Sequence, residues 1–379
     1  AYAPPRVTVT SFYNDDLMRL EKGGRRRAMT LASGCDFSSN DYLALAGSAA
    51  LRSAAMDALA RGVSPGSGGS RLLRGNCAEH LGLETDAARF FGSESALFVG
   101  SGFAANSLVV STLPQASDLI LHDELIHASV HEGMRMARAP CQNFAHNDVD
   151  AAADAIARWR AKGGCGTPWI ALETLYSMDG DVAPLDDFAS LAERTGAMLL
   201  IDEAHALGVC GPEGRGLAAH LHGCENVVTL VTCGKALGCE GALILAPAVL
   251  RDFLVNRGLS FIFSTAPSPL IAAIVRESLS IVANADERRQ RLRLIIEHAG
   301  ERLAPLGIIP SGTHIQPVPI GEDSRTMRIA EALQARGFDI RGIRPPTVPA
   351  GTARLRISLT LNIDEAAISE FATALEDLL

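Results

Sequence analysis

The sequence has no uninterrupted apolar run long enough to cross a lipid bilayer, and it does not begin with a charged and then apolar leader. Its only dense basic cluster is Arg25-Arg26-Arg27. Three adjacent arginines are more typical of a solvated surface than of a nucleic-acid interface, and the net charge of −9 also disfavours nucleic acid. These absences predict a protein that has neither a membrane span nor a nucleic-acid partner.

The eight cysteines form no Cys-x-x-Cys pair and show no regular spacing. Because disulfide frameworks are typical of short secreted chains with dense cysteines, this pattern predicts reduced thiols and a cytoplasmic location. Evidence for a metal site is equally sparse. His127 and His131 are four residues apart and could share a helix face, but no adjacent glutamate completes a zinc-protease motif. No metal is therefore expected.

Apolar residues make up 47% of the 379 residues, which predicts a folded globular protein, and the length predicts two domains. Between residues 46 and 278, short apolar runs alternate with amphipathic stretches. Strands are expected at 96–99, 119–121, 169–172, 198–201, 227–231 and 242–245, with helices such as 150–162 and 186–195 between several of them. This alternation predicts a large α/β domain with a mostly parallel sheet that is covered on both faces.

The two ends of the chain have a different character. Residues 1–45 form an N-terminal segment with a charged helical stretch at 15–27. Residues 279–379 are expected to form a small C-terminal α+β domain. Its expected elements are a helix from about 269 into the 300s, a strand at 315–320, a helix at 324–336 and a strand at 353–361. In that last strand Arg354 and Arg356 share one face and Leu355 and Ile357 the other, which is typical of a half-covered antiparallel sheet.

Two candidate catalytic groups follow the strands expected at 198–201 and 227–231. Asp202 and His205 come after the first, where ligands collect in doubly wound sheets, although a strand-end acid can also simply cap a helix. Lys235 comes after the second. Desolvation at a buried strand end would lower its pKa and favour the neutral, nucleophilic amine.

Two further features complete a possible site. Gly102 and Phe103 follow a predicted strand and open a helix, and backbone N–H groups at a helix start bind phosphate. His127 could stack its ring on a heterocycle, although a hydrogen-bonded core histidine is the ordinary alternative. Together with Asp202 and Lys235, these features are what pyridoxal phosphate needs: a phosphate anchor, a stacking ring, a carboxylate for the pyridine nitrogen and a lysine for the Schiff base.

Seven motifs, in this order and over nearly the whole chain, resemble those of the α-oxoamine synthase family of fold-type I pyridoxal-phosphate enzymes. They are Ser39-Asn40-Asp41-Tyr42-Leu43, Gly66-Ser67-Gly68-Gly69-Ser70-Arg71, Gly102-Phe103-Ala104-Ala105-Asn106, His127-Ala128-Ser129, Ser177-Met178-Asp179-Gly180-Asp181, Asp202-Glu203-Ala204-His205, and the run from Thr232 to Gly238. The resemblance implies a large domain with a mostly parallel, seven-stranded type of sheet, a small C-terminal domain, and a homodimer with a shared active site.

The resemblance also implies a role for each matching residue. Lys235 would hold the cofactor as a Schiff base and then move the α-proton of the substrate. Asp202 would pair with the pyridine nitrogen, and His127 would stack on the ring. His205 and Ser177 would hydrogen-bond the phenolic oxygen.

The phosphate group of the cofactor would be held from two sides. Gly102, Phe103 and Thr232 would bind it within one subunit. Ser264 and Thr265 would reach it from a second subunit.

The substrate side is implied by the C-terminal block 343–356, together with 144–148 and 315–317. This block resembles the family member that condenses L-alanine with a pimeloyl thioester, carried by coenzyme A or by an acyl-carrier protein. Arg356 would bind the amino-acid carboxylate, with Asn40 and Arg344 nearby. Arg354 lies on the same strand face, so the sequence alone leaves either arginine possible. Sister enzymes that use glycine or serine with other acyl thioesters, and a non-catalytic homologue, are the alternatives.

Overall fold

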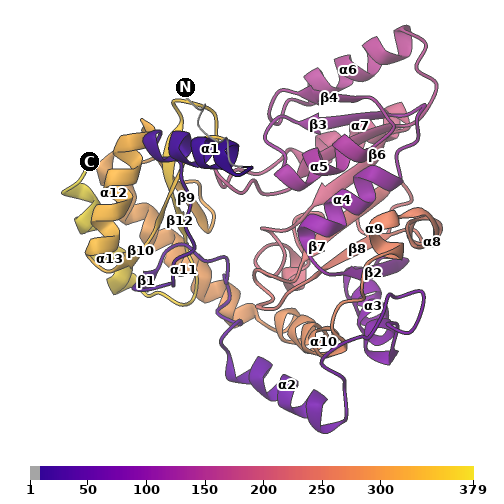
Figure 1. The fold of residues 1–379 in the computed structure, drawn as a ribbon, viewed down its shortest axis with the longest axis horizontal. Helices are drawn as coiled ribbons and strands as arrows, with labels where there is room; N and C mark the ends of the chain where they lie inside the picture. Colours follow the sequence, from indigo (N-terminus) through magenta and orange to yellow (C-terminus); the bar gives the residue numbers. More distant parts are fainter. Residues whose placement is uncertain (1–8) are drawn as a thin grey trace, which may run out of the picture.

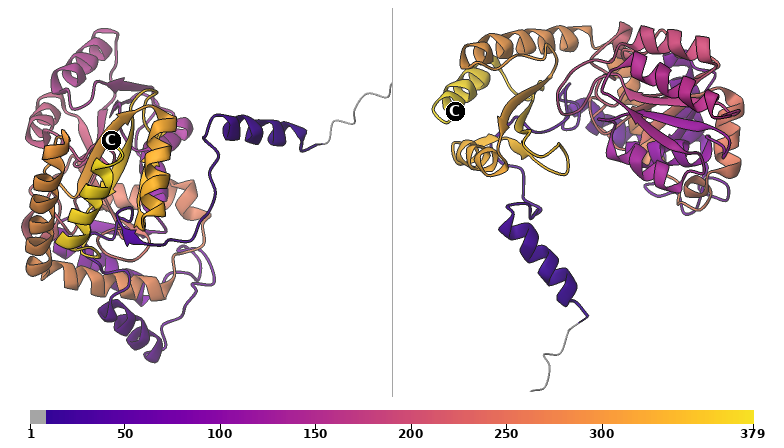
Figure 2. Two further views of the ribbon diagram at one scale, coloured as in Figure 1. Left: turned by 90° about the vertical axis from the view of Figure 1, so that its left-hand side faces the viewer. Right: turned by 90° about the horizontal axis from the view of Figure 1, so that it is seen from above.

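The computed structural model describes residues 9–379, so the first eight residues of the predicted N-terminal segment lie outside the described part. Figure 1 shows a large α/β domain beside a smaller α+β domain. The helix α1 (Ser11–Lys22) stands away from both domains and buries none of its residues, as both views of Figure 2 show. It begins four residues before the predicted helical stretch and ends before Gly23-Gly24, because two glycines do not favour helix continuation.

The large domain is built on a seven-stranded sheet with the order β2-β8-β7-β6-β5-β3-β4. Only β8 runs antiparallel to its neighbours, so the prediction of a mostly parallel sheet is confirmed. Its strands are β2 (Ser95–Val99), β3 (Leu119–Asp123), β4 (Cys141–Phe144), β5 (Pro168–Glu173), β6 (Met198–Asp202), β7 (Val227–Thr232) and β8 (Ala242–Ala246). Six of these were predicted. The edge strand β4 was not, because three of its four side chains are exposed and it has no apolar run.

Helices cover both faces of this sheet. They are α2 (Ala49–Ala60), α3 (Ala78–Phe91), α4 (Gly102–Thr112), α5 (Ala128–Met136), α6 (Val149–Ala161), α7 (Leu185–Thr195), α8 (Ala248–Arg257), α9 (Leu259–Ile262) and α10 (Pro269–Ala283), with a 3-10 turn at Pro212–Gly214. Successive strand residues point to opposite faces, so Leu200 packs in the cluster with α4 and α5 while Leu199 and Ile201 pack with α6 and α7. In the described residues no helix combines the length and the apolar character needed to span a membrane.

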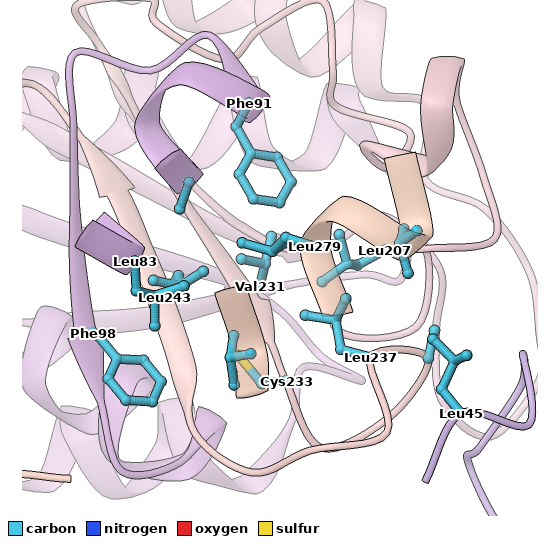
Figure 3. Close-up of a cluster of buried hydrophobic side chains, with 14 of the residues drawn as sticks. Leu45, Leu83, Phe91, Phe98, Leu207, Val231, Cys233, Leu237, Leu243 and Leu279 are labelled. Atoms are coloured by element: carbon cyan, nitrogen blue, oxygen red, sulfur yellow. The ribbon is translucent and has the colours of Figure 1, made fainter. Parts of the chain in front are cut away.

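One apolar cluster supports the segment that carries Lys235. Figure 3 shows Leu83 and Phe91 of α3 facing Val231 and Leu243, with Leu237 of the lysine segment beside them. Val231, Leu237 and Leu243 are completely buried. At roughly 1.5–3 kcal/mol per buried aliphatic side chain, this packing holds the end of β7 in place.

The small domain contains α11 (Asp286–Leu303), a 3-10 turn (Ala304–Leu306), β9 (Ile315–Gly321), α12 (Asp323–Ala335), β10 (Phe338–Asp339), β11 (Arg341–Ile343), β12 (Ala353–Ser358) and α13 (Glu365–Glu376). Its three-stranded antiparallel sheet has the order β11-β12-β9. The single helix expected from about 269 into the 300s is wrong. The helix is interrupted at Asn284-Ala285. The Asn284 side chain donates a hydrogen bond to the Ser280 carbonyl, and Asp286 begins a new helix.

A short N-terminal segment belongs spatially to the small domain. The strand β1 (Cys35–Asp36) pairs in parallel with β10, and Phe37 stacks on Phe371 with ring centroids 4.4 Å apart. The carbonyls of Phe37 and Tyr42 accept hydrogen bonds from the N–H groups of Ser358 and Leu361. The segment around residue 40 is therefore fixed beside β12. The division into 1–45, 46–278 and 279–379 remains a prediction, and its second boundary falls within α10.

Candidate active site

A cavity of about 170 Å³ opens at the carboxyl ends of β5, β6 and β7. It is lined by residues that lie in the last part of five different strands or follow them: Gly102, Phe103, Asn106, His127, Glu173, Asp202, Ala204, His205, Leu230, Val231, Thr232 and Lys235. Seven of the predicted site residues are among them. This is the edge where doubly wound sheets bind their ligands, because the loops after the strands converge there.

Lys235 is held on a tight loop between β7 and β8. Within this loop the N–H of Cys239 bonds the carbonyl of Cys233, and Gly238 takes a φ of +63°. A side chain at Gly238 would meet the backbone of Leu45 and Ala46 at less than 3 Å, so only glycine fits. The loop therefore leaves little freedom in where the lysine points.

The Lys235 amine lies 2.8 Å from Nε2 of His205. Burial lowers the pKa of Lys235 to about 8, although the carboxylates of Asp202 and Glu173 act in the opposite direction. Burial and the neighbouring Lys235 charge also depress the pKa of His205 well below its usual value. Near neutral pH, a neutral imidazole thus faces an amine that can lose its proton at modest cost.

Asp202 is the last residue of β6 and is buried. Its Oδ2 accepts a 2.7 Å hydrogen bond from Asn106 Nδ2, and its Oδ1 accepts one of 2.9 Å from the N–H of Ala204. Asn106 also donates to Ser129 Oγ, at 3.0 Å. These donors fix the carboxylate in the lining of the cavity, where it can pair with a protonated ring nitrogen.

His127 caps the first turn of α5. Its Nδ1 accepts from the N–H of Ser129 at 3.3 Å and lies 2.7 Å from the Ser129 hydroxyl. Burial lowers the pKa of His127, with Asp202 opposing that shift and Lys235 adding to it. The ring is therefore a neutral, fixed plane on the wall of the cavity, which suits stacking on a heterocycle.

The start of α4 provides a cradle for a phosphate. The Ser101 hydroxyl caps the helix by accepting from the N–H of Ala104, while the N–H groups of Gly102 and Phe103 have no intrahelical partner. A Cβ added at Gly102 would lie 3.4 Å from the hydroxyl of Thr232, so a side chain here would fill the space between them. Free N–H groups at a positive helix end, with a hydroxyl opposite, fit a phosphate group.

Next to the cavity lining, which we call the first wall, residues of the small domain and the N-terminal segment form a second group, which we call the second wall. Arg356, on β12, is buried and donates from Nε to the Ser177 carbonyl at 2.5 Å and from Nη2 to Asn40 Oδ1 at 3.1 Å. Its positive charge acts on Lys235 in the cavity lining, because it helps to lower the pKa of that lysine. Arg354, on the same strand, instead forms an ion pair with Asp179. Arg356 is thus the arginine that lies next to the cavity.

Six of the predicted site residues are not in the cavity lining: Asn40, Ser177 and Arg356, which belong to the second wall, and Ser264, Thr265 and Arg344. Ser264 and Thr265 are exposed, and Thr265 forms an isolated bridge with Ser70. Arg344 lies in the small domain, with Nη1 2.7 Å from the sulfur of Met327. Arg344 is not among the residues that line the cavity, so the geometry gives no support to its predicted role in substrate binding.

Sequence reasoning assigned no role to three residues that the structure places here. Asn106 and Tyr42 stand in motifs, and Tyr42 Oη lies 2.7 Å from His205 Nδ1. Glu173 ends β5 directly opposite Asp202, and burial together with Asp202 raises the pKa of Glu173 well above its usual value. The strand-end rule that identified Asp202 applies equally to Glu173, so this residue was within reach of the sequence.

Comparison with known proteins identifies the family. Residues 33–375 match the family described as aminotransferase class I and II. The chain belongs to this family. A family relative from Chromobacterium violaceum, named 8-amino-7-oxononanoate synthase, is 42% identical over 330 residues, which cover 86% of this chain and 84% of the relative.

Solved structures agree with this family assignment. A crystal structure of 8-amino-7-oxononanoate synthase from Francisella tularensis is 25% identical, with a TM-score of 0.77 over 91% of this chain and 97% of that one. Serine palmitoyltransferase from Sphingomonas wittichii superposes with a TM-score of 0.89 over 98% of both chains. At 24% identity, the latter likeness concerns the fold alone.

Proposed function

We propose that this protein condenses L-alanine with a pimeloyl thioester to give 8-amino-7-oxononanoate, carbon dioxide and a free thiol, the biotin-pathway reaction. The observation that carries the proposal is that Lys235 and Asp202 line one cavity, while Arg356, held by Asn40, lies close enough for its charge to lower the pKa of Lys235. The chain is also 42% identical to relatives that carry the name of this synthase, from Chromobacterium violaceum and Burkholderia thailandensis. That identity favours the alanine and pimeloyl pair over the glycine or serine reactions of sister enzymes.

The cofactor is pyridoxal phosphate, whose protonated ring withdraws electrons and stabilises negative charge at the Cα of the amino acid. Asp202, held by Asn106, keeps the ring nitrogen protonated. His127 supplies the stacking plane. The N–H groups at the start of α4 and the hydroxyl of Thr232 bind the phosphate.

The remaining residues act on the substrate. Arg356 binds the alanine carboxylate with two parallel hydrogen bonds. Lys235 accepts the α-proton, because its amine is partly neutral near neutral pH. A carbon–carbon bond then forms between Cα and the thioester carbonyl, and the thiol leaves with the carbon–sulfur electrons. Loss of the original carboxylate as carbon dioxide is followed by return of a proton to Cα.

The protein acts as a cytoplasmic homodimer in this proposal. The exposed Ser264 and Thr265 are available to reach the phosphate in the other subunit. Eight cysteines without a disulfide support a reducing compartment.

The test is thiol release from pimeloyl-CoA by the protein loaded with pyridoxal phosphate. Release that depends on L-alanine, and that is slow with glycine and acetyl-CoA or with serine and palmitoyl-CoA, is the expected result. Pimeloyl acyl-carrier protein is assayed in parallel, because the proposal covers a pimeloyl group carried either by coenzyme A or by an acyl-carrier protein. Thiol release only with glycine or serine and their acyl thioesters would replace the proposal with a sister activity. No thiol release with any combination of amino acid and thioester would rule the proposal out.

A further inference from the structure

A short loop at residues 70–75 presents three consecutive side chains to solvent. Leu72 is 49% exposed, Leu73 is 81% exposed, and Arg74 is exposed as well. Within residues 9–379, Arg74 has no hydrogen-bond or ion-pair partner, and none of the three side chains lines the cavity of its own chain. The loop thus displays two apolar side chains followed by an unpaired cation.

The backbone of this loop is held in a fixed shape. The carbonyl of Ser70 accepts hydrogen bonds from the N–H groups of Leu73 and Gly75, at 3.1 and 2.9 Å. Arg71 is buried and points inward, where its two terminal nitrogens donate to the two oxygens of Glu84 at 2.8 and 3.0 Å. The exposed side chains therefore start from an ordered backbone, which lowers the entropy cost of binding a ligand.

The loop is also tied to the segment that carries Thr265. Ser70 and Thr265 form an antiparallel bridge, and the N–H of Ala266 donates to the carbonyl of Gly69 at 2.9 Å. The Ser67 hydroxyl donates to the Ala266 carbonyl at 2.8 Å. In the proposed homodimer, Thr265 of one copy reaches the phosphate in the cavity of the other copy. Because of the bridge to Ser70, the loop accompanies Thr265 to that same cavity.

The proposed acyl substrate needs a cation that its own cavity does not offer. A pimeloyl thioester carries a second carboxylate at the far end of its methylene chain. In the described part of the chain, Lys235 is the one lysine or arginine in the cavity lining, and Arg356 beside it is assigned to the alanine carboxylate. Burial lowers the pKa of His127 and of His205, so both rings are neutral near neutral pH. A carboxylate that leaves water unpaired is costly, so a partner from outside this set is required.

We propose that Arg74 of one copy binds the terminal carboxylate of the pimeloyl group in the cavity of the other copy. Leu72 and Leu73 pack on the methylene chain, and the guanidinium next to them forms charge-assisted hydrogen bonds with the carboxylate. Arg74 is then the residue that favours a dicarboxylic acyl group over one that ends in a methyl group. This inference rests on the proposed function, because it concerns the recognition of the acyl substrate in that reaction.

The first test measures binding without turnover. Isothermal titration calorimetry of the dimer loaded with pyridoxal phosphate, without alanine, compares pimeloyl-CoA with heptanoyl-CoA, whose acyl chain ends in a methyl group. The wild type should bind pimeloyl-CoA about tenfold or more tightly than heptanoyl-CoA, and Arg74→Gln should remove this preference. Arg74→Lys keeps the positive charge and should retain part of it. Equal affinities in the wild type, or an undiminished preference in Arg74→Gln, would overturn the inference.

A matched arginine controls for a general effect of charge. Arg61 is exposed at the end of α2, and Arg61→Gln should leave both affinities unchanged. An equal loss of affinity for both thioesters in Arg74→Gln would mean that the guanidinium binds coenzyme A and not the acyl group, which would also overturn the inference. The melting temperature shows that each variant is folded.

The second test shows from which copy Arg74 acts. Lys235→Ala and Arg74→Gln chains are co-expressed with different affinity tags, so that only mixed dimers are purified. If Arg74 acts across the interface, one cavity of each mixed dimer combines Lys235 with an intact Arg74. Thiol release should then show the wild-type KM for pimeloyl-CoA at about half of the wild-type kcat, whereas Arg74→Gln homodimers should show a KM that is about tenfold or more higher. A mixed dimer with that higher KM would place Arg74 in the cavity of its own chain and overturn the inference.

The two tests separate this inference from the proposed function. If the binding preference depends on Arg74 but no thiol is released, the carboxylate site stands and the reaction assignment is lost. If thiol release from pimeloyl-CoA is normal and Arg74→Gln keeps the full preference, the reaction assignment stands and the carboxylate site is lost.

Discussion

The two walls of the cavity are built in different ways. On the first wall, Asp202 is the last residue of a strand of the large sheet, and Lys235 follows another strand within a few residues. On the second wall, Arg356 and Asn40 are 316 residues apart in sequence and meet only because the segment around Asn40 packs beside β12. The groups assigned to proton chemistry thus lie on one rigid sheet, and the group assigned to substrate recognition lies at a junction between domains.

This difference has a consequence for function. A residue fixed by the sheet keeps its position as long as the large core is packed. A residue at the junction keeps its position only while the small domain and the N-terminal segment stay together. We therefore expect changes on the first wall to abolish chemistry, and changes on the second to weaken substrate binding first.

The largest effect is expected for Lys235→Ala on the first wall. The chain has only three lysines, and Lys22 and Lys162 are both exposed. Loss of the base should lower thiol release on the order of a thousandfold or more, with little change in the melting temperature. Lys162→Ala is the matched control and should keep full activity. Near-normal turnover by Lys235→Ala would remove the proposed mechanism.

The next largest effect separates the two arginines of β12. Arg356→Gln removes the charge next to the cavity, so KM for alanine should rise by about ten- to a hundredfold, as expected for charge-assisted hydrogen bonds. Arg354→Gln breaks the ion pair with Asp179 and should change KM by less than about threefold. Circular dichroism and the melting temperature show whether both variants fold. The reverse order of effects on KM would assign the carboxylate to Arg354.

The sequence predicted the first wall well for a local reason. Each of its groups follows an apolar run, so the strand pattern and the residue after it were enough to place Asp202 and Lys235 at the same edge. The edge strand β4 was not predicted, because its residues are mostly exposed and show no apolar pattern. The break between α10 and α11 at Asn284-Ala285 was not predicted, because the apolar pattern continues across it.

The second wall was only partly within reach. The alternation in β12 correctly put Arg354 and Arg356 on one face but could not choose between them. Which arginine lies near the cavity depends on two distant residues: Asp179 forms an ion pair with Arg354, and Asn40 accepts a hydrogen bond from Arg356. Contacts between residues so far apart in sequence leave no local pattern. The link from Tyr42 to His205 is hidden for the same reason.

The loop that joins the two walls is held by a half-buried histidine. His146 lies 2.8 Å from Asp123 Oδ1 through Nδ1, and 2.7 Å from Asp181 Oδ2 through Nε2. Asp123 ends β3, whereas Asp181 belongs to the loop whose Ser177 carbonyl accepts from Arg356. Burial alone would lower the pKa of His146, but the hydrogen bonds to the two carboxylates outweigh it and raise the pKa to about 10. At neutral pH the ring is therefore an imidazolium that ties this loop to the sheet.

The smallest effect is expected for His146→Gln, and it depends on pH. Since the folded pKa of about 10 lies above the unfolded value of about 6.5, the stabilisation is complete below pH 6.5 and is lost as the pH rises through 10. Near pH 7 the variant should be less stable by about 2 kcal/mol, and the gap in urea midpoint should close as the pH approaches 10. His222→Gln is the control, because burial lowers the pKa of His222 to about 4 and its ring stays neutral across this window. A gap between wild type and His146→Gln that stays constant with pH would mean that the imidazole holds the loop without its charge.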